Sequence, residues 1–120
     1  MIENPQKFIK ETSKLGAMIN PATPIRAIKD VITMTDMIGV MAVNPGFGGQ
    51  KYIERTQEKV QELKILIDNK GANTLIEVDG GVNDVIGKRL AEAGADVLVV
   101  GSYIFNALNP LERIDSLYKL

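Results

Sequence analysis

Four short apolar segments alternate with helical patterns along this chain, and that alternation constrains the fold more than any other feature. Each segment is mostly apolar and is long enough for one buried strand. The segments are residues 17–20, 38–43, 75–79 and 96–100. Strands that alternate with helices pair in parallel through right-handed crossovers. The sequence therefore predicts an α/β fold built on a parallel sheet of about four strands.

Helical patterns precede, separate and follow these segments. The clearest is the stripe of Val60, Leu63, Leu66 and Ile67 within residues 54–70, which recurs at helical spacing. Further helices are expected over residues 5–15, after Pro24, over residues 84–93 and from Pro110, with a short helical turn at residues 103–106. In the helix after Pro24 and in the last helix, the residues expected to face inward are Ile25, Ile28, Val31, Ile32, Leu111, Ile114, Leu117 and Tyr118.

Composition excludes several classes of chemistry. The 120 residues are expected to form a single domain, residues 1–120. Fourteen basic and 15 acidic residues leave no basic excess, so we expect neither nucleic acid nor an anionic membrane as a partner. His and Cys are both absent, so imidazole and thiol chemistry are excluded and any metal would need oxygen ligands. The sequence shows no membrane-spanning apolar run and no signal-peptide pattern, and we expect a cytoplasmic protein.

Glycine follows each of the last three apolar segments. The sites are Gly46, Gly48 and Gly49 within residues 44–50, then Gly80-Gly81, then Gly101-Ser102. In parallel α/β folds the carboxyl ends of the strands lie on one face, and that face carries the ligand site. Closely spaced backbone N–H groups at such ends suit a phosphate. We therefore expect a phosphate site there, and the alternative is that each glycine only serves a tight turn.

Asp79 is the candidate catalytic residue. It ends the third apolar segment beside Gly80-Gly81, and strand alternation places it on the same face as Leu75 and Glu77. A carboxylate at that position can remove a proton next to a carbonyl group. The alternative is that it caps the turn by accepting backbone N–H bonds. Glu77 could be a second acid, but in the middle of a strand it is expected to be a paired structural residue. Asp36 is expected to lie on the surface, and Asp96 is expected at the end of its strand remote from the site.

Several stretches resemble the ribulose-phosphate 3-epimerase family. They are residues 40–50 (VMAVNPGFGGQ), 77–83 (EVDGGVN), 93–96 (AGAD), 100–105 (VGSYIF) and 20–24 (NPATP). The similarity covers most of the chain, and the glycine-loop stretch is specific among phosphate-binding barrels. Residues 103–106 also suit the similar allulose-6-phosphate 3-epimerases, which remain an alternative.

The resemblance implies part of a (β/α)8 TIM barrel in which a metal-bound ketose phosphate is epimerised at C3 through an enediolate. In the pentose phosphate pathway this converts D-ribulose 5-phosphate to D-xylulose 5-phosphate. Asp79 would be one of two acid–base carboxylates and also a ligand of the divalent metal, of zinc, iron or manganese type. Met41 would lie against the enediolate, whereas by its pattern alone it is a core residue of a strand. The phosphate and substrate would be held by Gly46, Phe47, Gly48, Gly49, Gly80, Gly81, Gly101 and Ser102.

The resemblance also implies that parts of the family's barrel have no counterpart here. Family members have two further strands that carry a Ser, a His and the other catalytic Asp. A second His ligand precedes the stretch that residues 1–5 match, and a strand and a helix would separate Leu15 from Gly16. We therefore expect a partial barrel that does not bind the family's metal and that has unpaired strand edges. Two such half-barrels are expected to pair as a homo-oligomer.

Three functions follow from these expectations. The first is a truncated ribulose-phosphate 3-epimerase that acts on a ketose phosphate. The second is a half-barrel that binds a phosphosugar or phosphate without catalysis. The third is an inactive fragment.

Overall fold

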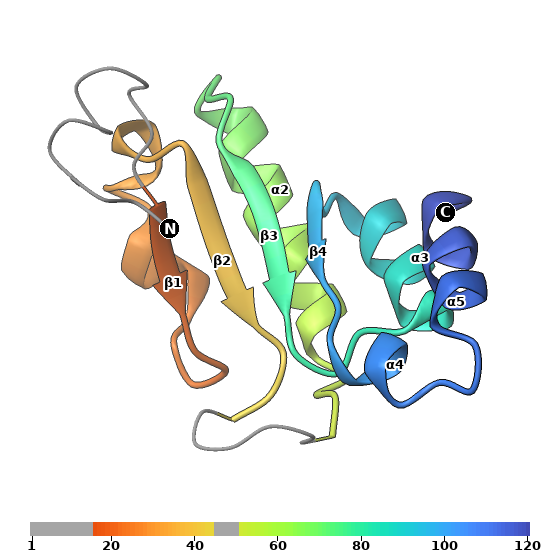
Figure 1. Cartoon of the computed structure of the whole chain (residues 1–120). Helices are drawn as coiled ribbons and strands as arrows, with labels where there is room; N and C mark the ends of the chain where they lie inside the picture. Colours follow the sequence, from red (N-terminus) through yellow and green to blue (C-terminus); the bar gives the residue numbers. More distant parts are fainter. Residues whose placement is uncertain (1–15, 45–50) are drawn as a thin grey trace, which may run out of the picture.

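A parallel sheet of four strands forms the centre of the molecule in the computed structural model, which describes residues 16–44 and 51–120 (Figure 1). The strands are β1 (Gly16–Ile19), β2 (Met37–Met41), β3 (Leu75–Asp79) and β4 (Val97–Val99). They lie side by side in chain order, and every neighbouring pair is parallel. This confirms the predicted α/β fold. The helix expected over residues 5–15 and the glycines at residues 46–49 lie outside the described residues.

Helices connect the strands and cover one side of the sheet. The two 3-10 helices η1 (Ile25–Ile28) and η2 (Ile32–Met34) link β1 to β2. The longer α2 (Thr56–Asn69) and α3 (Asp84–Ala93) make the next two crossovers, and α4 (Ser102–Phe105) and α5 (Pro110–Tyr118) follow β4. Among the described residues, no helix is both long enough and apolar enough to cross a membrane.

The two faces of the sheet differ because successive residues of a strand point in opposite directions. Ile38, Val40, Ile76 and Val78 are fully buried, and they share one core with Val60, Leu63, Ile67 and Leu90 of the helices. The alternation expected for residues 75–79 is therefore confirmed. The opposite face carries the alternate residues, and we call it the concave face: Met18, Met37, Gly39, Met41, Leu75, Glu77, Asp79, Val97 and Val99.

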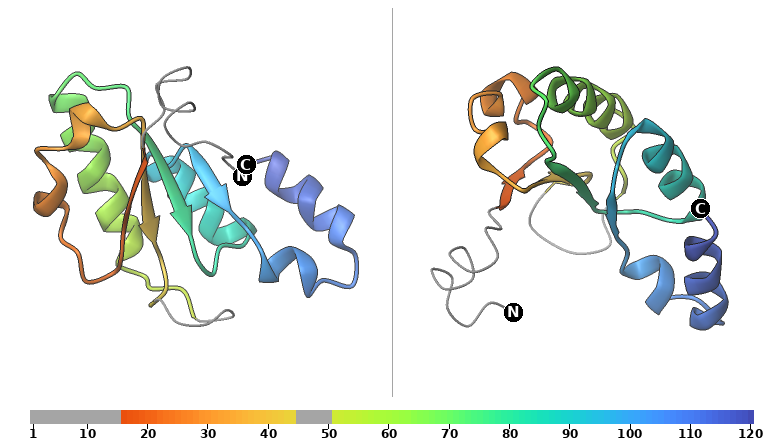
Figure 2. Two further views of the ribbon diagram at one scale, coloured as in Figure 1. Left: turned by 60° about the vertical axis from the view of Figure 1, so that its left-hand side comes forward. Right: turned by 90° about the horizontal axis from the view of Figure 1, so that it is seen from above.

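Seen from above, the strands follow an arc with η1, α2 and α3 on its outer side (Figure 2). Within the part of the chain that the structure describes, no helix lies on the inner side of the arc. The arrangement is that of a (β/α) barrel cut open along its length, with β1 at one margin and β4 at the other.

The segment after Pro24 differs from its prediction. A single helix with Val31 turned inward was expected, but the chain forms η1 and η2, and Val31 is 38% exposed. Backbone N–H groups here bond to the carbonyl three residues back, as in Val31 to Ile28 and Met34 to Val31. Val, Ile and Thr crowd residues 31–35, and such β-branched residues disfavour a regular α-helix. Ile25, Ile28 and Ile32 are buried as predicted.

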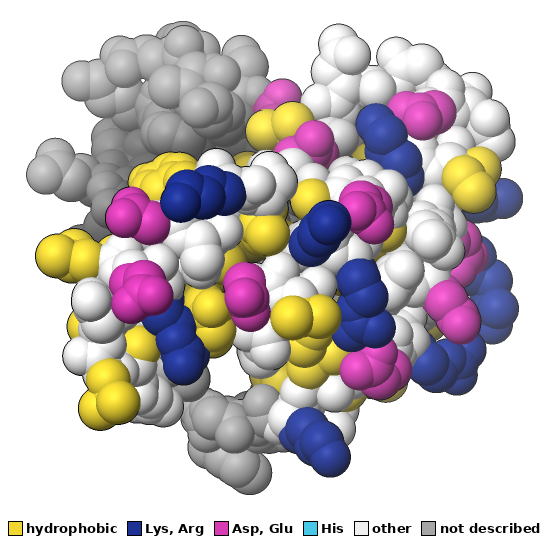
Figure 3. Space-filling view, turned by 90° about the vertical axis from the view of Figure 1, so that its right-hand side faces the viewer, with side chains coloured by type: hydrophobic (Ala, Val, Ile, Leu, Met, Phe, Trp, Pro, Cys, Tyr) yellow, Lys and Arg dark blue, Asp and Glu magenta, His cyan; other side chains and the backbone are white. Residues whose placement is uncertain are grey.

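Helix α5 lies beyond the margin of the sheet, and this changes which residues it buries. Leu111 and Tyr118 were expected to face inward, but they are 74% and 85% exposed, whereas Ile114 and Leu117 are half-buried. The reason is that α5 packs chiefly against α3 and α4, with Ile114 and Leu117 turned toward β4 and Leu111 and Tyr118 turned to solvent. On the side of the molecule near α3 and α5, Lys and Arg are interspersed with Asp and Glu, with hydrophobic side chains between them (Figure 3).

Candidate active site

The carboxyl ends of β2, β3 and β4 bring the candidate site residues together. Met41, Asp79 and Val99 are direct register partners in three neighbouring strands, and their side chains share the concave face. Asp79 is half-buried, and its carboxylate accepts no hydrogen bond from the described residues. The chain thus presents a carboxylate that is not engaged in capping any described backbone N–H group.

Gly80-Gly81 makes a turn that only glycine can make here. Their φ angles are +122° and +66°, in the region that L side chains rarely adopt. A Cβ at Gly80 would lie 2.8 Å from Cγ2 of Val43, and one at Gly81 would lie 3.0 Å from the backbone N of Tyr52. The double glycine therefore serves the turn whether or not it also contacts a ligand.

The same contacts fix both ends of the segment that carries the glycine loop. Val43 and Tyr52 flank that segment, and both pack against the double glycine. The backbone N–H of Ala42 donates to the carbonyl of Asp79 at 2.7 Å, and that of Ile53 donates to the carbonyl of Ala42 at 2.8 Å. The ends of the segment are therefore held beside Asp79, although Gly46, Phe47, Gly48 and Gly49 themselves are not described.

Gly101 contrasts with the double glycine. A Cβ built on it would meet no atom within 4 Å, so nothing among the described residues requires glycine at this position. Its carbonyl accepts hydrogen bonds from the N–H groups of Ile104 and Phe105. These bonds form the first turn of α4. Nothing is described for the side chain of Ser102. The open space in front of Gly101 is what a ligand bound against the backbone would use.

Helix α4 is held in place by α5 through Tyr103. The Arg113 guanidinium donates to the Tyr103 carbonyl at 2.9 Å and lies 4.1 Å from the centroid of its ring. The hydroxyl of Ser116 donates to the carbonyl of Arg113 at 2.8 Å. These contacts fix the backbone that follows Gly101.

Comparison with known proteins identifies this arrangement. A family model described as the ribulose-phosphate 3 epimerase family matches residues 1–105. The chain belongs to the ribulose-phosphate 3-epimerase family.

Named relatives give the extent of the similarity. The chain is 45% identical over 102 residues to the chloroplastic ribulose-5-phosphate-3-epimerase of Arabidopsis thaliana, a match that covers 85% of this chain and 36% of that protein. It is 46% identical over 101 residues to the ribulose-phosphate 3-epimerase of Bacillus subtilis, covering 82% of this chain and 46% of the relative. The Escherichia coli K12 enzyme is 42% identical over 118 residues, covering 97% and 52%. The chain thus spans about half the length of these relatives or less.

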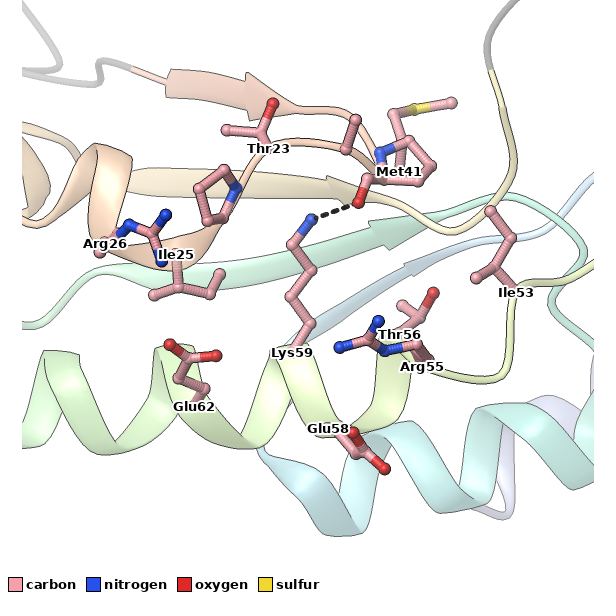
Figure 4. Close-up of a pocket in the computed structure, with 13 residues that line it drawn as sticks. Thr23, Ile25, Arg26, Met41, Ile53, Arg55, Thr56, Glu58, Lys59 and Glu62 are labelled. Carbon is pink, nitrogen blue, oxygen red and sulfur yellow. Dashed lines mark hydrogen bonds between the residues drawn. The ribbon is translucent and has the colours of Figure 1, made fainter.

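Lys59 is a half-buried cation of α2, and it was not among the site residues expected from the sequence. It lies in a cavity of about 430 Å³ between η1 and α2, and its Nζ donates to the carbonyls of Asn20 and Pro21 at 2.9 and 3.2 Å (Figure 4). Burial lowers the pKa of Lys59, Glu62 opposes that shift and Arg55 adds to it. The signal was present: Lys59 interrupts the inward-facing stripe of α2 between Thr56 and Leu63.

The residues that Lys59 holds form the turn at the carboxyl end of β1. The Asn20 side-chain oxygen accepts hydrogen bonds from the Ala22 N–H and from the Thr23 hydroxyl, both at 3.0 Å. Lys59 adds two more bonds to the same turn from α2. The stretch NPATP, residues 20–24, is therefore a structural turn that fixes the carboxyl end of β1. We call the edge of the sheet formed by the carboxyl ends of the four strands the rim.

Three further acidic residues lie near the strands, and the structure shows different surroundings for each. Asp96 lies just before β4, at the end remote from the site as expected, and its carboxylate accepts a hydrogen bond from the Ile76 N–H at 2.8 Å. Asp36 is exposed, as expected. The Glu77 carboxylate makes no ion pair or hydrogen bond with the described residues, and its expected pairing stays a prediction. The direct register partners of Glu77, Gly39 and Val97, have no side chain that could donate a hydrogen bond.

Within the part of the chain that the structure describes, the donor set does not fit the metal of the family. The described residues contain no group of three or more His, Cys, Asp or Glu that could hold a metal ion. Asp79 has no second carboxylate as a direct register partner in β2 or β4. Asp79 as a metal ligand remains a prediction, and we derive no step through a metal.

Proposed function

We propose that this chain supplies one half of a ribulose-phosphate 3-epimerase site. It binds a ketose phosphate at the carboxyl ends of β2, β3 and β4 and presents Asp79 as a single acid–base carboxylate. The observation that carries the proposal is the half-buried Asp79 carboxylate on the concave face, in register with Met41 and directly before Gly80-Gly81. Family membership supplies the substrate class, a phosphorylated ketose such as D-ribulose 5-phosphate.

The phosphate is placed by backbone groups. Gly80-Gly81 and Gly101 lie at the ends of the neighbouring strands β3 and β4, and the ends of the segment with Gly46, Phe47, Gly48 and Gly49 are fixed against the double glycine. Backbone N–H groups at such strand ends suit a phosphate without any cationic side chain. Ser102 would add a hydroxyl to this set.

Asp79 acts on the carbon next to the ketose carbonyl. Removing the C3 proton leaves an enediolate, and the protonated Asp79 can return a proton to the same face of C3. Inversion needs a second acid on the opposite face. One carboxylate alone therefore exchanges the C3 proton with solvent and restores the original configuration. The zinc, iron or manganese type of metal implied by the family would stabilise the enediolate, but the described residues do not assemble a site for it.

The test is proton exchange at C3. D-ribulose 5-phosphate and D-xylulose 5-phosphate are incubated in D2O with the chain and with Asp79→Asn, and loss of the C3 proton signal is followed by NMR. We expect exchange in one of the two sugars, and a drop of about 10²–10⁴-fold in Asp79→Asn because one positioned acid–base group is removed. Asp68→Asn serves as the matched control, since Asp68 is an exposed carboxylate on α2, on the opposite side of the sheet from the site.

Two outcomes would contradict the proposal. Equal exchange with the chain and with Asp79→Asn would remove the catalytic role of Asp79. Unchanged chemical shifts on titration with inorganic phosphate and with either sugar would remove the binding role as well. Binding without exchange would favour the non-catalytic phosphosugar half-barrel, and a ketohexose phosphate in the same titration tests the allulose-6-phosphate alternative suggested by residues 103–106. A cytoplasmic location remains a prediction from the sequence.

A further inference from the structure

The outer edges of β1 and β4 pair with no other strand in the described part of the chain. Within the described residues, each edge therefore presents backbone N–H and C=O groups that no neighbouring strand pairs with. Proteins usually protect such edges with charged residues, proline or a covering helix. Here β1 reads Gly-Ala-Met-Ile and β4 reads Val-Leu-Val, so neither edge carries a charge or a proline.

The concave face between these edges carries exposed apolar side chains beside Glu77 and Asp79. Met18, Leu75 and Val99 are 53%, 42% and 37% exposed. The Met18 side chain lies across Gly39, where a Cβ would overlap its Sδ atom. In the interior of a closed barrel, residues at these positions fill the space between strands.

A second apolar surface adjoins the free edge of β4. A groove of about 440 Å³ runs between β4 and α5, and its apolar lining includes Leu98, Val100, Ile114 and Leu117. Helix α5 extends beyond β4 and away from the rest of the sheet (Figure 2). A strand added to the edge of β4 would thus be covered by α5 on its outer side and would extend the concave face on its inner side.

We infer that a second copy of this chain docks on the first, so that β4 of each copy pairs with β1 of the other and the two arcs close into one eight-stranded barrel. A two-fold rotation about the axis of the arc keeps all strands parallel. The same β4-to-β1 contact then forms twice, so the assembly closes at two copies and leaves no edge. A second copy fits because this class of barrel closes at eight strands and the described part of each copy supplies four.

The dimer deepens the proposed function, on which this consequence rests. The rotation keeps all the carboxyl ends of the strands at one rim, so the two Asp79 carboxylates face each other across a shared cavity. Opposed carboxylates are what inversion at C3 requires. The rotation also brings the two Glu77 side chains into the same interior, where like charges repel. Glu77→Gln is therefore expected to tighten the dimer, and a weaker dimer in that variant would count against the inference.

The first experiment measures assembly without any ligand. Sedimentation velocity on the 120-residue chain is compared with Met18→Asp and with Ile65→Asp, and circular dichroism checks that each variant is folded. Ile65 is the matched control because it is 61% exposed but lies on α2, outside the proposed interface. We expect a dimer, weakened about tenfold or more by Met18→Asp and unchanged by Ile65→Asp.

Two results would overturn the inference. One is a folded monomer at every concentration, which would mean that the concave face is covered from within its own chain. The other is a dimer that Ile65→Asp weakens and Met18→Asp does not.

A second experiment tests the β4-to-β1 contact and does not depend on the stability of a charged variant. The sequence contains no cysteine, so Met18→Cys and Val99→Cys each introduce a single thiol. The two proteins are mixed and treated with a short bismaleimide reagent. We expect mixed cross-linked dimers to exceed those formed by either protein alone, because Met18 of one copy lies at the junction with β4 of the other. Equal cross-linking in the unmixed samples would indicate pairing through like surfaces and would refute the arrangement.

The failure of this inference is distinguishable from failure of the proposed function. A monomer that binds ketose phosphate and exchanges the C3 proton would leave the proposed function in place and remove the dimer. A dimer that binds no phosphosugar would do the reverse.

Discussion

The two faces of the sheet are made by the same strands but have opposite properties. On the outer face, Ile38, Val40, Ile76 and Val78 are fully buried under the helices. On the concave face, the alternate residues include exposed apolar side chains and two carboxylates, Glu77 and Asp79. The comparison teaches that one face holds the fold together, whereas the other presents exposed apolar and acidic side chains, on which the proposed substrate site and the proposed dimer both depend.

The largest expected effect is a difference in unfolding free energy between substitutions on the two faces of β3. Ile76→Ala removes a side chain with no exposed surface, and the cavity it leaves should cost about 2–5 kcal/mol of unfolding free energy. Leu75→Ala, one residue earlier on the concave face, should cost less than about 1 kcal/mol, because Leu75 is already largely accessible to water. Urea unfolding followed by circular dichroism measures both, at a concentration where the chain is monomeric. Similar losses in the two variants would show that the concave face also belongs to the core.

The next effect separates two glycines of the rim. Gly81→Ala forces a side chain into a φ of +66° against the Tyr52 backbone and should cost about 1–3 kcal/mol of stability. Gly101→Val should leave stability nearly unchanged, because its Cβ meets open space, but should weaken binding of inorganic phosphate. Thermal unfolding and an NMR phosphate titration give the two readouts. Undiminished phosphate binding by a folded Gly101→Val protein would mean that the open space at Gly101 is not used by the ligand.

The smallest effect concerns the outer layer, where Lys59 binds the turn after β1. Lys59→Met should cost about 1 kcal/mol through loss of two hydrogen bonds to backbone carbonyls. Because burial lowers the pKa of Lys59 in the folded state, the unfolded chain binds more protons just below pH 10.5, and the contribution of Lys59 to stability should rise with pH in that window.

This pH dependence is checked by urea unfolding between neutral pH and about pH 10. Lys59→Met should lack the Lys59 contribution. Lys64→Met serves as the control on the same helix, because the Lys64 side chain is 44% exposed and its Nζ pairs with Asp68 at 3.2 Å. The same pH dependence in both variants would assign the effect to another group. The partly buried Tyr52 has the opposite sign: burial raises its pKa, so its contribution to stability is lost above about pH 10.

Elements with local signals at both ends could be predicted from the sequence. The bounds 84–93 match α3 because Asn83 caps its first turn, accepting the Ile86 N–H at 2.8 Å, and Gly94 ends it. The alternation in residues 75–79 likewise placed Asp79 on the open face. Each of these features depends on neighbouring residues alone.

Features that depend on tertiary surroundings could not be predicted. Leu111 and Tyr118 have the spacing of a buried stripe, but α5 lies beyond the sheet margin and nothing described covers them. The two 3-10 helices were missed because helical spacing cannot distinguish them from an α-helix over so few residues. The role of Lys59 required knowing that the turn after β1 lies opposite α2.

The hydrogen bond from Ile53 to Ala42 has a consequence for how such a site can change over time. With Val43 and Tyr52 packed on the double glycine, both ends of the intervening segment are anchored by atoms that do not belong to it. We expect that the sequence between the anchors could be exchanged for another of similar length without altering the strands that flank it. Under the proposed function, substrate range could then diversify in that segment while the framework is inherited intact.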